Sequence, residues 1–205
     1  MSIPIIKQIE QKIKSLKKGK ILFISDFVEI SNDVTIRQSL QRLTKTGIII
    51  RLSHGIYYIP KQDKLLGIIH PSIEKIAEAI AKRDKARIIP TGSYAQYKLG
   101  LSTQVPMNIV YLTDGSPRKI QIGKQKINFK KTNPKNLAVK HQLSNLIIQA
   151  LKTYKDDSVS EEVIKQLKKI ITHSNELEII KNNIYNAPVR VQKIVLQIIK
   201  EIENE

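Results

Sequence analysis

The sequence predicts an α+β protein of 205 residues, and three features of its hydrophobic pattern support that fold class. Isoleucine and leucine recur at helical spacing near the N-terminus. Short runs typical of strands follow over residues 86–131, and the pattern is helical again over 135–205. We therefore expect an N-terminal domain over residues 1–62 and a mixed α+β domain over 67–205, with a helical C-terminal part.

The first 30 residues predict two helices. Residues 2–18 carry Ile5, Ile9 and Ile13 on one face at helical spacing, with lysines elsewhere. The short apolar segment 21–28 contains serine and aspartate, which favour helix starts, and predicts a brief second helix.

A third helix and a hairpin complete the N-terminal domain. Residues 33–46 follow the turn Ser31–Asp33, which supplies an N-cap. Two strand-like runs, 48–51 and 56–60, flank a turn that contains glycine, and they predict a β-hairpin. Three helices and a hairpin in this order are typical of a winged helix-turn-helix, in which the third helix enters the major groove.

The third helix predicts a DNA-reading surface opposite its apolar face. Ile36, Leu40 and Leu43 should pack inward. Arginine and glutamine suit the hydrogen-bonding edges of guanine and adenine, whereas threonine and lysine suit phosphates. The helix offers Thr35, Arg37, Gln38, Gln41, Arg42 and Lys45, and the hairpin adds Arg51 and His54. The alternative is a solvated amphipathic helix with an exposed loop histidine.

The positive charge is confined to one part of the chain. The net charge is +17, yet residues 141–205 hold nine basic and nine acidic side chains. The whole excess therefore lies in residues 1–140, which indicates a surface for a polyanion, with nucleic acid favoured over an anionic membrane or a lysine-rich proteome.

A second basic element follows the hairpin strands of the second domain. Residues 118–140 contain no acidic side chain. Strand alternation should bury Ile127 and Phe129 and place the intervening lysines on the other face. The candidates for duplex phosphate contact are Arg118, Lys124, Lys126, Lys130 and Lys131. The alternative is a solvated lysine-rich sheet face.

The remaining elements of the second domain follow from the same patterns. A linker is expected over 61–66 and a helix over 71–85. Strands are expected at 86–89, 108–113, 119–123 and 125–130, and helices at 135–153, 158–172, 174–183 and 188–203. On the last hairpin strand of the N-terminal domain, alternation predicts that one of Tyr57 and Tyr58 faces the core and the other faces solvent.

The sequence argues against an enzyme, and we expect no catalytic residues, no cofactor and no metal. The segment Thr91–Tyr94 is similar to the Gly-Ser loop of nucleotidyltransferases but lacks the nearby carboxylates that hold metal ions. The four histidines are dispersed, and the pairs Asp156–Asp157 and Glu161–Glu162 suit a loop and a helix start. With no cysteine and no long apolar run, we expect a cytoplasmic protein that does not bind membranes.

The sequence resembles AbiEi-like antitoxins of type IV (abortive infection) toxin–antitoxin systems over about two thirds of its length. The resemblance covers Val34–Leu43, Gly47–Arg51 and Gly55–Pro60 in the N-terminal domain. In the second domain it covers Pro90–Ala95 and Leu99–Pro106, and it extends into the strands up to about Phe129.

The resemblance implies a transcriptional repressor that binds double-stranded operator DNA, with inverted repeats, in its own operon. It also implies a functional link to a nucleotidyltransferase-like toxin without a stable complex, and a monomer or weak dimer that binds DNA cooperatively. The alternative function is a protein-interaction module, docking through its helical C-terminus, whose basic surface binds polyanions non-specifically.

Overall fold

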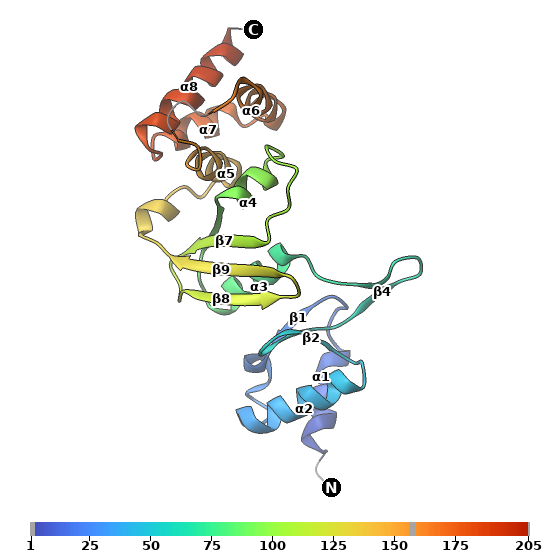
Figure 1. Cartoon of the computed structure of the whole chain (residues 1–205). Coiled ribbons are helices and arrows are strands. Elements are labelled where there is room, and N and C mark those ends of the chain that lie inside the picture. Colours follow the sequence, from blue (N-terminus) through green and yellow to red (C-terminus); the bar gives the residue numbers. More distant parts are fainter. Residues whose placement is uncertain (1–2, 156–158, 205) are drawn as a thin grey trace. The chain divides into compact units, whose positions relative to one another are not determined.

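The computed structural model describes residues 3–155 and 159–204 and has the α+β architecture expected from the sequence (Figure 1). The chain forms two compact units. The first comprises Met1–Ile80 with Gln121–Gly123, and the second comprises Ala81–Ile120 with Lys124–Glu205. The division falls within helix α3 (Ile73–Arg83), whereas the boundary at residues 62–67 stays a prediction.

The N-terminal unit contains two α-helices, a 3₁₀ turn and two small sheets within its described residues. The first sheet has the antiparallel order β1-β3-β2, and β4 and β5 form a separate two-stranded sheet. Before α3, the elements are α1 (Ile5–Lys14), β1 (Ile21–Phe23), η1 (Ile24–Phe27), α2 (Asp33–Lys45), β2 (Ile50–Ser53), β3 (Ile56–Tyr58), β4 (Lys61–Asp63) and β5 (Gly67–Ile69).

The brief second helix expected over residues 21–28 is wrong. Ile21–Phe23 instead pairs antiparallel with β3, and only a single 3₁₀ turn follows. The Asp26 carboxylate accepts a hydrogen bond of 2.8 Å from the Phe23 N–H, which ties the turn to the end of the strand. Sheet pairing satisfies more backbone groups here than a two-turn helix would, because short helices leave most of their terminal groups unbonded.

One aliphatic core holds α1, α2 and the first sheet together. Ile9 and Ile13 of α1 pack in this cluster with Ile36, Leu40 and Leu43 of α2, and all five are buried. The two apolar stripes expected from the sequence are therefore confirmed. Burial of this face fixes the opposite face of α2 toward solvent, because residues three and four apart share one side of a helix.

The expected alternation of Tyr57 and Tyr58 is wrong, because both side chains are buried. Both faces of β3 are covered, because Tyr57 packs in the core with residues of α1 and α2, whereas Tyr58 lies against His70. The Tyr58 hydroxyl lies 2.7 Å from Nδ1 of His70, and burial raises the pKa of Tyr58 above its ordinary value.

The linker expected over residues 61–66 forms the first part of the β4–β5 hairpin. Lys61 pairs with Ile69, and Asp63 pairs with Gly67. The Asp63 carboxylate accepts hydrogen bonds from the N–H groups of Leu65 and Leu66, which fixes the tip of the hairpin. The sequence pattern did not predict this hairpin, because the tip is apolar rather than rich in the residues that favour turns.

The second unit contains a four-stranded sheet of order β6-β7-β9-β8, in which β6 and β7 are antiparallel and β7 and β9 are parallel. The four expected strands are confirmed within two residues at each end. They are β6 (Ile88–Thr91), β7 (Asn108–Thr113), β8 (Arg118–Ile122) and β9 (Gln125–Lys131). The C-terminal end of α3 precedes them, and α3 confirms the helix expected over residues 71–85 within two residues at each end.

A short helix that the sequence did not predict, α4 (Ser93–Lys98), follows β6 directly. The chain turns into it at Gly92, whose φ of 66° and ψ of −146° lie in a region that only glycine adopts without strain. This turn brings Tyr94 against Tyr111 of β7, with ring centroids 5.8 Å apart. The turn residue therefore fixes how α4 meets the sheet.

Gly92→Ala is expected to destabilise the protein by about 1–3 kcal/mol. No atom lies within 4 Å of the added Cβ, so the cost comes from the backbone conformation rather than from crowding. Denaturant unfolding followed by circular dichroism measures the effect. Ser93→Ala, at the next position in the same turn, is the control. Equal free energies of unfolding of the two variants would contradict backbone strain at position 92.

The C-terminal part of the second unit is helical, as expected, and packs around one aliphatic core. The helix expected over residues 135–153 is wrong at its start, because a separate 3₁₀ turn comes first and the α-helix begins at Gln142. The apolar residues that recur along one face of the last helix all belong to this core or pack against it: Val191, Ile194, Ile198 and Ile202. The elements are η2 (Pro134–Leu137), α5 (Gln142–Leu151), α6 (Glu161–Ser174), α7 (Leu177–Ile184) and α8 (Val189–Glu203).

Arg190 joins the start of α8 to the end of α5. Its guanidinium donates hydrogen bonds to the carbonyl oxygens of Leu151, Tyr154 and Lys155 at 3.2, 2.6 and 3.2 Å. These contacts satisfy carbonyl groups at and just beyond the helix end, where a cation also suits the helix dipole.

Candidate nucleic-acid interface

The solvent face of α2 is rich in side chains that donate hydrogen bonds. The helix begins at Asn32, whose side-chain oxygen accepts from the N–H of Thr35 at 3.0 Å, so the expected N-cap is confirmed. Five of the six sequence-derived candidates on this helix are exposed: Arg37, Gln38, Gln41, Arg42 and Lys45. They form one continuous polar surface opposite the buried leucines.

Thr35, the sixth candidate, is occupied within the protein. Its hydroxyl donates to the Asn32 side-chain oxygen at 3.0 Å, and the residue is half-buried. Thr35 therefore stabilises the start of α2, and we leave it out of the candidate interface.

A groove separates α2 from the β2–β3 hairpin. It has a volume of about 270 Å³, and its lining residues are Ile24, Arg37, Gln41, Thr44, Lys45, Arg51, His54, Gly55 and Tyr57. The hairpin turns at His54 and Gly55, and the φ of +70° at Gly55 suits glycine in a two-residue turn. The two basic candidates of the hairpin thus share one concave surface with three candidates from the helix.

His54 lies between two guanidinium groups in this groove. Its Nε2 is 3.1 Å from Nη1 of Arg37, and its Nδ1 is 3.2 Å from Nη2 of Arg51. Asp33 lies on the far side of Arg37, with a carboxylate oxygen 3.7 Å from Nη2. The sequence placed these three basic residues in one interface, but only the fold shows that they touch.

Gln38 and Arg42 lie outside the groove, on the neighbouring part of the exposed face. Neither side chain has an internal hydrogen bond or ion pair within the part of the chain that the structure describes. One turn earlier, Val34 is 65% exposed, and sequence reasoning missed it. The sequence could have identified Val34, because it is an apolar residue at a helical position opposite the buried stripe. An apolar side chain there suits the methyl group of thymine.

The second basic element lies on β9 of the other unit. Ile127 and Phe129 are buried, whereas Lys126 and Lys130 alternate with them and are exposed, as expected. Lys124 is exposed in the turn before β9. These three lysines, which we call the β9 lysines, form the basic surface of this sheet.

Lys131 does not share the face of the β9 lysines. It pairs with Thr113 at the end of the strand, and alternation puts it on the side of Phe129. Lys131 therefore does not share one basic face with the other candidate lysines, because adjacent residues of a strand point to opposite faces.

Arg118 is held inside its unit rather than presented to solvent. Its guanidinium forms an ion pair with Asp84, and it lies 5.7 Å from the ring centroid of Phe129. Burial, and then the positive charge of Arg83, lower the pKa of Arg118 from its ordinary value. We therefore remove Arg118 from the candidate phosphate contacts. The sequence could not show this pairing, because Asp84 lies 34 positions earlier.

In the segment similar to a nucleotidyltransferase loop, the side chains and backbone take part in the protein's own structure. The Thr91 hydroxyl donates to Oε1 of Gln149 at 3.1 Å, and Ser93 begins α4. Across residues 3–155 and 159–204, no three His, Cys, Asp or Glu side chains cluster as a metal site would require. Glu161 is the first residue of α6, whereas Asp156 and Asp157 lie outside the described residues.

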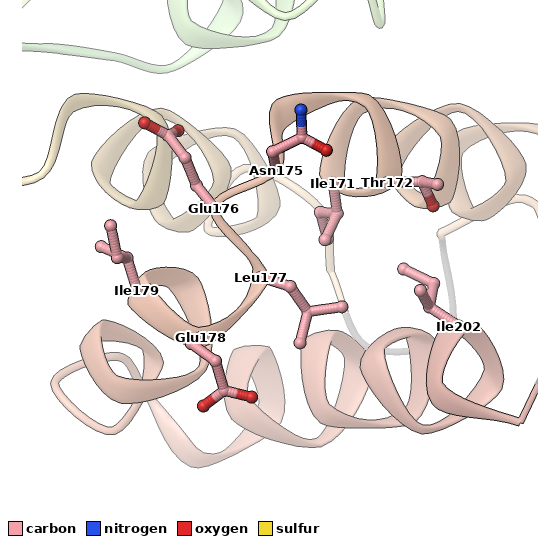
Figure 2. A pocket seen from close by; sticks show the side chains of 8 residues that line it. All are labelled: Ile171, Thr172, Asn175, Glu176, Leu177, Glu178, Ile179 and Ile202. Carbon is pink, nitrogen blue, oxygen red and sulfur yellow. The ribbon is translucent and has the colours of Figure 1, made fainter.

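The helical part holds another hollow, with a volume of about 320 Å³, between α6, α7 and α8 (Figure 2). Figure 2 shows Ile171, Leu177 and Ile202 pointing into it, whereas Glu176 points away. The Glu176 carboxylate lies 3.3 Å from Nε2 of His141. Its lining combines apolar side chains with the carboxylates of Glu176 and Glu178, and it contains no basic residue that would attract nucleic acid. Among the described residues, no helix is long and apolar enough to cross a bilayer.

Comparisons with known proteins match the chain to a family and to distantly similar solved structures. A model for a family of unknown function, DUF6088, matches residues 8–179. No curated protein matches the chain. A crystal structure of the RV2827C protein from Mycobacterium tuberculosis has a TM-score of 0.45 and 11% sequence identity, over 95% of this chain and 82% of that chain.

Proposed function

The chain belongs to a family of unknown function, DUF6088, and we propose that it is a sequence-specific double-stranded DNA-binding protein. In this proposal α1, η1, α2 and the β2–β3 hairpin act as a winged helix-turn-helix, and α2 enters the major groove. The role is that of a repressor of its own operon, as the resemblance to AbiEi-like antitoxins implies. This role includes no catalysed reaction, because DNA binding needs no catalytic group.

The observation that carries the proposal is the two-sided character of α2. Leu40 and Leu43 fix one side in the core, so the rigid helix presents Gln38 and Arg42 to solvent without internal partners in the described residues. Glutamine can pair with the N6 and N7 of adenine, and arginine with the O6 and N7 of guanine. Side chains held on a rigid element give the fixed geometry that base recognition requires.

The hairpin and the β9 lysines supply the sequence-independent part of binding. Arg51 and His54 border the groove beside α2, where backbone phosphates of a duplex can enter. The excess of positive charge in residues 1–140 would attract DNA and make its binding depend on salt.

The test compares the chain's binding to its upstream DNA and to a scrambled duplex of equal length, over a series of salt concentrations. We expect tighter binding to the upstream DNA by about 10³-fold or more, as specific DNA-binding proteins show. Equal and steeply salt-dependent binding to both duplexes would refute sequence-specific recognition.

A role as an antitoxin extends this proposal and has its own test. Expression of the chain should restore growth to cells that carry the adjacent nucleotidyltransferase-like toxin gene, and affinity purification should recover no stable complex of the two proteins. Failure to restore growth would exclude the antitoxin role while leaving operator binding intact.

A second candidate function is a protein-interaction module, which the hollow between α6, α7 and α8 favours. Its apolar residues Ile171, Leu177 and Ile202 could hold an apolar side chain of a partner. Non-specific binding to both duplexes, together with loss of a protein partner on Leu177→Asp, would favour this candidate over the repressor.

A further inference from the structure

The cluster of Arg37, Arg51 and His54 contains more hydrogen-bond donors than acceptors. A guanidinium group only donates hydrogen bonds. A neutral imidazole has one acceptor nitrogen and one N–H, so His54 can accept from only one of the two arginines that face its ring. A protonated imidazole would donate from both nitrogens, and the three groups would then lack an acceptor among themselves.

The other hydrogen-bond acceptors of this chain contact the two guanidinium groups only on the sides that face away from His54. The Asp33 carboxylate lies 3.7 Å from Nη2 of Arg37, and the Ser53 carbonyl accepts from Nε of Arg51 at 3.3 Å. The edges that face His54 have no acceptor besides the imidazole within the described residues. An anion with several oxygens would satisfy these donors.

The surroundings of His54 favour an anion. The charged or titratable groups that face the groove are Arg37 and Lys45 from α2, Arg51 from β2 and Tyr57 from β3, with Asp33 behind Arg37. Arg37, Arg51 and His54 are all exposed, so a large polyanion can reach them from solvent. The groove of about 270 Å³ leaves space between the helix and the hairpin.

We propose that Arg37, Arg51 and His54 together bind one backbone phosphate of the DNA, and that DNA binding takes up a proton at His54. This inference rests on the proposed function. It changes the role expected for Arg37 from reading a base to fixing the position of the duplex. The phosphate oxygens accept from both guanidinium groups, and protonation gives the imidazole a second donor. DNA affinity then rises as the pH falls through the range in which histidine titrates.

The experiment measures dissociation constants of wild type, Arg51→Ala and His54→Gln on both upstream and scrambled duplexes, over a salt series. Arg51→Ala should weaken binding to both duplexes by the same factor, about tenfold, and reduce the salt slope by about 1. Wild type should bind more tightly at about pH 6 than at about pH 8, and His54→Gln should remove that difference. Lys17→Ala, which removes an exposed charge from the same unit, is the control for net charge.

Two results would overturn the inference. One is a loss confined to the upstream duplex in Arg51→Ala, which would indicate base reading. The other is an unchanged pH dependence in His54→Gln. Inorganic phosphate distinguishes the source of the phosphate. If it shifts the His54 imidazole signals of wild type in NMR while Arg51→Ala leaves duplex affinity unchanged, the site binds the free anion and the DNA assignment fails.

The outcomes also separate this inference from the proposed function. Equal binding of wild type to both duplexes would refute operator recognition, yet the effects of Arg51→Ala and His54→Gln on the scrambled duplex would still test the phosphate site. Preference for the upstream duplex that persists in both variants, with an unchanged salt slope, would refute the phosphate site alone.

Discussion

Gln38→Ala combined with Arg42→Ala is expected to remove most of the preference for upstream DNA over a scrambled duplex. Each bidentate pair between a side chain and a base contributes about 1–3 kcal/mol of discrimination, so the double variant should lose about 10²-fold or more in affinity for the upstream duplex. Binding to the scrambled duplex should fall only slightly, because one positive charge is lost. Fluorescence anisotropy at fixed salt concentration measures both affinities.

The double variant should fold normally, which makes a loss of binding interpretable. Both side chains are exposed and have no internal partner in the described residues, and such substitutions usually change stability by less than about 0.5 kcal/mol. Lys7→Ala with Gln11→Ala is a matched control, since these exposed residues of α1 are also one cation and one glutamine, four positions apart. An unchanged preference in the Gln38/Arg42 variant, or an equal loss in the control, would show that this face of α2 does not read bases.

The sequence predicted α1, α2 and the long C-terminal helices because their apolar stripes coincide with buried faces, whereas it missed the short helix α4. Ile36, Leu40 and Leu43 fall at helical spacing, and the structure buries all three. The same stripe predicts which side of α2 faces solvent, so most of the candidate interface on this helix followed from the sequence. Local periodicity was sufficient there because the whole argument concerns one element.

The errors arose where long-range pairing decides the structure. Ile21–Phe23 forms a strand because β3 lies beside it, and Tyr57 and Tyr58 are both buried because other parts of the fold cover each face of that strand. The pairing of Arg118 with Asp84 likewise joins residues that are 34 positions apart in the sequence. No local pattern encodes these neighbours, so sequence reasoning assigned these residues to the wrong surroundings.

The contact of His54 with Arg37 and Arg51 is a related case. The sequence places two of these residues at the hairpin and the third on a helix, 17 positions earlier than His54. Only the packing of the hairpin beside α2 joins them into one cluster. The shared role that we infer for them therefore depends on the tertiary fold, whereas the polar face of α2 does not.

Lys126→Glu combined with Lys130→Glu is expected to weaken DNA binding without changing sequence preference. The β9 lysines project from a strand whose other face is buried through Ile127 and Phe129, so their positions are fixed relative to the sheet. If Lys126 and Lys130 each neutralise one phosphate, the salt slope should fall by about 2, and affinity at about 0.1 M salt should fall at least about tenfold on both duplexes. The salt dependence of binding to each duplex measures these effects.

The control for this variant separates a local contact from a change in total charge. Lys165→Glu with Lys193→Glu makes the same change in net charge on exposed positions of α6 and α8, within residues 141–205, where nine basic and nine acidic side chains balance. If the β9 lysines contact phosphates, only their reversal should change the salt slope, because counterions are released only where a cation meets the DNA. Equal effects of the two double variants would mean that the β9 surface is a solvated sheet face, and DNA contact would then be confined to the N-terminal unit.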